Sequence, residues 1–141
     1  MRALITLLIS KILLTAVAVC IPLLFFSPEL LQRLGFLVPE ATLFLRLLGI
    51  AYLALLVSYA FGVREARRGI YPAAIVWVGI VSNTGACLIL SLAAVQGSWA
   101  HWGQLARLSM FGAQLGTAGI AAGLLYFGPC RAKHYKIPSA L

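Results

Sequence analysis

The chain has 141 residues, of which 62% are hydrophobic and 10% are charged, and its formal net charge is +8. A soluble domain of this size cannot bury so large an apolar fraction, because much of a small protein is surface. The composition therefore excludes an ordinary soluble domain and predicts one integral membrane domain over residues 1–141. The basic residues lie beside apolar segments, which favours anionic lipid headgroups over nucleic acid as their partner.

Four apolar segments are long enough to cross a bilayer, since ~20 helical residues span its hydrocarbon core of ~30 Å. In chain order they cover residues 7–26, 43–62, 73–95 and 108–127. They predict an all-α fold, a four-transmembrane-helix bundle whose first partner is the lipid bilayer. Lys11 is expected about one turn inside the hydrocarbon edge of the first crossing, with its ammonium reaching back to the headgroups.

A short interfacial helix is expected directly after the first crossing. Ser27 suits the N-cap, Pro28 the first helical position, and Glu29 complements the positive end of the helix dipole. Leucines alternate with polar residues from there to Gly35, as in a helix that lies on a membrane surface. A plain connecting loop is the alternative.

The distribution of Lys and Arg sets the expected topology. With the amino terminus in the cytoplasm, three basic residues lie outside, namely Arg33, Arg46 and Arg107. The other eight lie inside: Arg2, Lys11, Arg64, Arg67, Arg68, Arg131, Lys133 and Lys136. The excess predicts a multi-pass protein of the cell (inner) membrane with both termini cytoplasmic.

Small residues mark two candidate packing faces. On the fourth crossing, spacings of four, three and four place one group of glycines on one helix face: Gly112, Gly116, Gly119 and Gly123. In lipid, such a stripe lets two backbones approach closely. We expect it to contact the second or third crossing, with a dimer or partner interface as the alternative. Gly79 and Ala86 share a similar face of the third crossing with Asn83.

Asn83 lies near the middle of the third crossing, where lipid offers its amide no hydrogen-bond partner. Gln114 on the fourth crossing is the nearest polar residue in depth, and we expect the two to form a hydrogen bond. The alternative is a polar lining for a small-solute site, to which Ser82 and Thr84 would add their hydroxyls.

Arg46 lies one turn inside the start of the second crossing. Its guanidinium is expected to extend to the headgroups, and pairing with Glu40 or Glu29 is the alternative.

Candidate catalytic residues and cofactor ligands are not found in the sequence. The chain has no aspartate and no paired cysteines, and His101 and His134 fall on opposite sides of the membrane in the expected topology. We therefore expect neither a metal site nor a cofactor, and a protein that is not an enzyme.

Two stretches carry a family resemblance: Ser-Pro-Glu-Leu-Leu-Gln-Arg-Leu-Gly from Ser27 and Leu-Arg-Leu-Leu-Gly-Ile-Ala-Tyr from Leu45. They resemble small four-helix bacterial membrane proteins of unknown function, some of them grouped as DoxX-like. The resemblance covers about the first 60 residues and implies a four-helix bundle.

Two functions are compatible with these features. The first is a structural or accessory subunit of a membrane assembly, as a homo-oligomer or within a larger complex. The second is a small-solute or ion channel or carrier with a polar face around Asn83 and Gln114.

Overall fold

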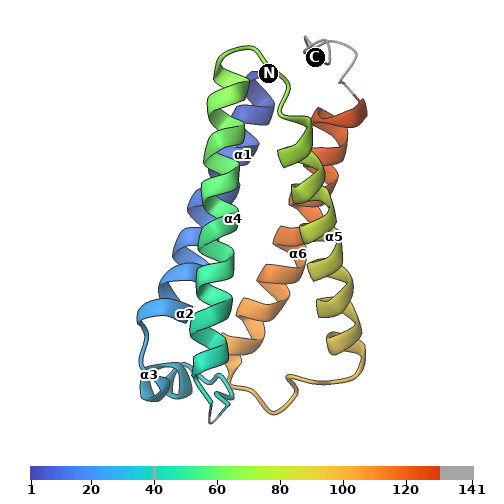
Figure 1. Ribbon diagram of the computed structural model, residues 1–141. Coiled ribbons are helices and arrows are strands. Elements are labelled where there is room, and N and C mark those ends of the chain that lie inside the picture. The colour runs from blue at the N-terminus through green and yellow to red at the C-terminus, as the bar shows by residue number, and fades with distance from the viewer. Residues whose placement is uncertain (40, 131–141) are drawn as a thin grey trace.

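The computed structural model describes residues 1–39 and 41–130, and these residues form an all-helical bundle (Figure 1). Four helices are long and apolar enough to cross a membrane: Arg2–Phe25, Leu43–Arg67, Ala73–Val95 and Gln104–Phe127. The expected fold class is confirmed. Three of the helices extend past the expected crossings, because apolar composition marks the lipid boundary whereas a helix continues through polar residues such as Arg64 and Gln104.

The first of these helices changes its winding along its length. It consists of α1 (Arg2–Thr15), the π-helical segment η1 (Ala16–Cys20) and α2 (Ile21–Phe25). Pro22 has no N–H to donate to the carbonyl four residues earlier, and its ring crowds that carbonyl. The wider turns of η1, just before the proline, relieve this conflict without ending the helix.

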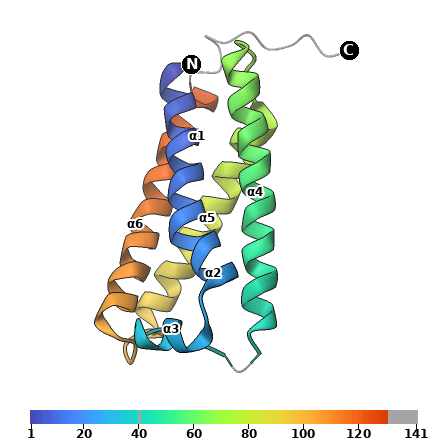
Figure 2. The same ribbon diagram turned by 90° about the vertical axis from the view of Figure 1, so that its left-hand side faces the viewer.

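The expected interfacial helix is present as α3 (Pro28–Arg33). Ser27 is its N-cap, and the Ser27 hydroxyl accepts a 3.2 Å hydrogen bond from the amide of Leu30. Its residue Leu31 is buried, and the chain turns away at Gly35, whose φ of 87° suits a residue without a side chain. Helix α3 lies across the end of the bundle opposite Met1 (Figures 1 and 2). This end is called the α3 end below.

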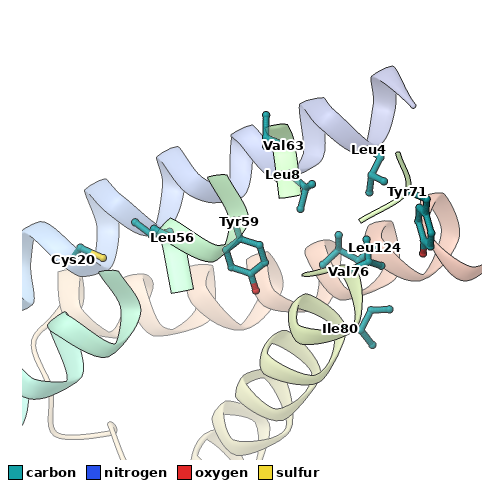
Figure 3. Packing of buried hydrophobic residues seen from close by; sticks show 10 residues of the cluster. All are labelled: Leu4, Leu8, Cys20, Leu56, Tyr59, Val63, Tyr71, Val76, Ile80 and Leu124. Atoms are coloured by element: carbon teal, nitrogen blue, oxygen red, sulfur yellow. The ribbon is translucent and has the colours of Figure 1, made fainter. Parts of the chain in front are cut away.

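The remaining helices are α4 (Leu43–Arg67), α5 (Ala73–Val95) and α6 (Gln104–Phe127). Helix α1 packs mainly on α4, and α5 packs mainly on α6. Near Met1 the two pairs meet closely, where Gly62 of α4 faces Ile75 and Gly123 of α6 faces Leu7 of α1. Most of the buried apolar cluster in Figure 3 lies in this half of the bundle: Leu4, Leu8, Leu56, Tyr59, Val63, Tyr71, Val76, Ile80 and Leu124.

Candidate functional site

The half of the bundle nearer α3 contains a cavity of about 1250 Å³. All four long helices contribute apolar wall residues, among them Leu14, Leu55, Ile89 and Met110. This volume exceeds the ~300–1,000 Å³ typical of small-molecule pockets. We call this space the bundle cavity.

Side chains of the α3 region cover the outer end of the bundle cavity. Phe36 follows α3 and meets Trp102 edge to face, with ring centroids 5.8 Å apart. The amide of Gly103 donates a 2.9 Å hydrogen bond to the carbonyl of Gly35. A Cβ on Gly35 would lie 2.6 Å from the Cα of Gly103, so this close approach of two loops requires glycine. The α3 region is thereby fastened to the start of α6.

Four polar side chains form the other end of the bundle cavity, which we call the polar floor: Lys11, Tyr59, Ser82 and Asn83. The Lys11 ammonium donates a 2.8 Å hydrogen bond to Oδ1 of Asn83. It also lies over the ring of Tyr59, 4.8 Å from the centroid, in a cation–π contact. The hydroxyl oxygens of Tyr59 and Ser82 are 3.2 Å apart, a hydrogen bond that links α4 to α5.

Lys11 is buried, with 7% of its surface exposed, so the expectation that its ammonium reaches the headgroups is wrong. Its place on the helix explains this. Leu4, Leu8 and Lys11 follow one another at spacings of four and three, which puts the lysine on the buried face of α1. At 1.5 Å per residue, Lys11 lies ~14 Å along the helix from Arg2, so its ammonium pairs within the bundle instead.

The expected hydrogen bond between Asn83 and Gln114 is not formed, and each amide has another partner. The Asn83 amide nitrogen donates a 2.5 Å hydrogen bond to the carbonyl of Gly79, one turn earlier. The Gln114 amide nitrogen donates a 3.0 Å hydrogen bond to the hydroxyl of Ser91. The contact between Gly79 and Leu124 fixes how the antiparallel helices α5 and α6 align, and this alignment places Gln114 nearly two turns from Asn83.

The other predicted members of the polar site are dispersed. Ser82 belongs to the polar floor, whereas Thr84 is exposed on another face of α5. Arg46 binds at the far end of the first long helix, where its guanidinium donates to the carbonyl oxygens of Leu23 at 2.6 Å and Phe26 at 2.7 Å. These carbonyls lie in the last turn of α2 and just after it, so Arg46 supplies donors that the helix end lacks.

Where the glycine stripe on α6 meets another helix, at Gly116 and Gly123, that helix is α1, so the expectation of a contact with the second or third crossing is wrong. Only Gly123 packs tightly, since a Cβ there would lie 3.0 Å from Leu7. Gly112 and Gly116 line the bundle cavity, and a Cβ on Gly119 would meet nothing within 4 Å. The absence of side chains at Gly112 and Gly116 thus enlarges the cavity.

The two small residues predicted on α5 have different roles. At Gly79, a Cβ would lie 2.5 Å from Leu124 and 3.4 Å from the Tyr59 ring, so close packing there depends on glycine. Ala86 lines the bundle cavity.

Two members of the polar floor, Lys11 and Tyr59, were not predicted as site residues. Both could have been found from helical spacing, because Tyr59 follows Leu56 by three residues and precedes Val63 by four on the buried face of α4.

Within residues 1–39 and 41–130, no three His, Cys, Asp or Glu side chains gather as a possible metal site. Searches of protein-family models, curated proteins and solved structures found no match to this chain.

Proposed function

We propose that this protein is a multi-pass protein of the cell membrane that binds a small, mainly apolar molecule inside its bundle and does not act on it chemically. The observation that supports this proposal is the bundle cavity of about 1250 Å³, whose walls are mainly apolar and whose floor carries the clustered polar groups. Binding sites for small molecules commonly combine apolar walls with a few placed polar groups, and they occur between the helices of bundles.

The location and direction of the chain in the membrane are part of the proposal. Met1 and the end of α6 lie at the same end of the bundle (Figures 1 and 2). The excess of Lys and Arg that the sequence assigns to that side of the membrane supports a cytoplasmic position for both termini. The α3 end would then face the outside.

The arrangement of polar groups counts against the second of the two expected functions, a small-solute or ion channel or carrier. Channels select ions with rings of backbone carbonyls or charged side chains, and pores for other solutes are lined by hydrogen-bonding groups. The walls of the bundle cavity are mainly apolar, and Gln114 is bonded to Ser91 away from Asn83. We therefore propose binding of a mainly apolar molecule rather than conduction of ions. An accessory role in a larger membrane assembly stays a prediction, and such a subunit could hold the molecule for its partner.

Native mass spectrometry of the protein, extracted gently from its own membrane, tests this proposal with two matched variants. A Cβ at Gly112 or Gly119 would meet nothing within 4 Å, but only Gly112 lines the bundle cavity. We expect the natural chain and Gly119→Leu to retain a bound small molecule and Gly112→Leu to lose it. Retention by all three proteins, or by none, would contradict the proposal. So would a dimer that Gly112→Leu separates, because a second copy would then fill the space.

A further inference from the structure

The ammonium of Lys11 is only partly satisfied by the protein. It has three N–H donors, of which one is used by Asn83 at 2.8 Å, while the Tyr59 ring contributes a cation–π contact. The side chain is 93% buried, since 7% of its surface is exposed, and it lines the bundle cavity. Donors of a buried cation therefore remain available at the polar floor.

The charge of Lys11 is not balanced by a neighbouring carboxylate in the described part of the chain. Its partners Asn83 and Tyr59 are neutral, and Ser82 beside them is also neutral. No acidic side chain of residues 1–39 and 41–130 lines the bundle cavity, and Glu29 and Glu65 are exposed outside its walls. A cation within a membrane normally pairs with an anion, because lipid does not solvate it. The polar floor is thus suited to an anionic group.

The apolar walls define the rest of the ligand. A hydrocarbon chain that moves from lipid into an apolar cavity gains little, since both surroundings are equally apolar. Selectivity must therefore come from the head group that reaches the polar floor. That head must be small, because it enters between helices to the depth of Asn83, near the middle of α5.

We infer that the bundle cavity binds a single-chain amphiphile with a small acidic head, a carboxylate or a phosphate monoester, whose anionic oxygens accept hydrogen bonds from the Lys11 ammonium. The Tyr59 and Ser82 hydroxyls lie beside the same position and are the next available donors. The chain of the amphiphile extends along the apolar walls toward Phe36 and Trp102. This inference rests on the proposed function and adds the chemical class of the ligand.

Equilibrium competition against two tracers, radiolabelled palmitate and radiolabelled hexadecyl phosphate, with the purified protein in nanodiscs of zwitterionic lipid, tests the inference. The competitors are palmitate, hexadecyl phosphate, methyl palmitate and hexadecanol, which differ in the charge of the head. We expect one or both acids to bind the natural chain at least tenfold more tightly than the ester and the alcohol. The two acids distinguish a carboxylate ligand from a phosphate ligand.

Two variants at Lys11 test whether the lysine provides this selectivity. Lys11→Met keeps an unbranched apolar stem and removes the charge, so we expect the acids to lose their advantage over the ester. Lys11→Arg keeps the charge, and we expect acid selectivity to remain. If Lys11→Met does not fold, the ratio of acid to ester affinity in the natural chain still shows whether the bundle cavity selects acids.

The possible failures are distinguishable. Equal affinities of acid, ester and alcohol in the natural chain, with all three lost in Gly112→Leu, would overturn the inference and leave the proposed function intact. The same holds if acid selectivity persists in Lys11→Met. If none of the four compounds binds, both the inference and the proposed function fail.

Discussion

The ammonium of Lys11 on α1 donates a 2.8 Å hydrogen bond to Oδ1 of Asn83 on α5, 72 residues later in the chain. This bond joins the α1–α4 pair to the α5–α6 pair at the level where close packing gives way to the bundle cavity. It also explains how a charge can lie within a span, since the amide oxygen and the Tyr59 ring partly replace the water that the ammonium loses.

Removing the Asn83 amide while the Lys11 charge remains should lower the free energy of unfolding more than removing both groups. Asn83→Leu leaves a buried ammonium without its partner, and we expect a loss of about 3–5 kcal/mol in the free energy of unfolding. The double variant Lys11→Met/Asn83→Leu should recover most of this loss, because no buried charge remains. Unfolding by SDS in mixed micelles, followed by circular dichroism, gives both values. A loss of only about 0.6 kcal/mol in Asn83→Leu, the value of an ordinary hydrogen bond in a membrane, would contradict a buried charge.

Close packing of α5 on α6 should depend on the glycine at position 79. A Cβ there would lie 2.5 Å from a methyl group of Leu124, which is fully buried. We expect Gly79→Leu to lower the free energy of unfolding by about 1–3 kcal/mol through overpacking. Gly119→Leu on α6 is the matched control and should have little effect, because a Cβ at that position would meet nothing within 4 Å. The same unfolding assay compares the two, and equal effects would show that Gly79 is not tightly packed.

The orientation in the membrane can be read from cysteine labelling. Cys130 is exposed just after α6, and Ser98 is exposed in the connector between α5 and α6 at the other end. In intact cells, we expect a membrane-impermeant maleimide to label Ser98→Cys in a Cys130→Ser background. Cys130 of the natural chain should react only after the membrane is permeabilised. Labelling of Cys130 in intact cells would reverse the proposed topology.

Helix α3 should become less stable in acid. The Glu29 carboxylate accepts hydrogen bonds from the backbone amide of Glu29 and from the Ser27 side chain. These hydrogen bonds lower the pKa of Glu29 below its usual 4.5. A lowered pKa means that Glu29 stabilises folded α3 above its unfolded pKa, and that this contribution disappears as the pH falls through the folded value. We expect the hydrogen-exchange protection of residues 27–36 to fall below pH 4.5 in the natural chain. In Glu29→Gln the fall should be absent, and an equal fall in both proteins would assign it to another group.

Periodicity and composition were sufficient for the helices but not for the site. The third crossing was predicted as residues 73–95 and is observed as Ala73–Val95, because Pro72 and the turn after Val95 mark both ends in the sequence. The short helix after Ser27 was predicted from its capping residues and from the alternation of leucines with polar residues that follows them. Both features depend on local chemistry that a single segment contains.

Contacts between helices depend on how the helices align, which no single segment specifies. The alignment of α5 with α6 is set by Gly79 against Leu124, and it separates Gln114 from Asn83 although their estimated depths were similar. Lys11 was misplaced for a different reason, since a charged residue near the start of a span was expected to reach the headgroups. Its spacing from Leu4 and Leu8 already pointed to the buried face, and that signal was the better one.

The pairing of Lys11 with Asn83 can be measured directly in lipid by solid-state NMR. Asn83 is the only asparagine in the chain, so selective ¹³C labelling of asparagine reports on one side chain. With ¹⁵N-labelled lysine, we expect strong dipolar dephasing of the Asn83 amide carbon by a lysine Nζ, because the ammonium lies 2.8 Å from the amide oxygen. The dephasing should vanish in Lys11→Met. Absence of dephasing in the natural chain would place the ammonium away from Asn83 and would contradict both the polar floor and the binding site built on it.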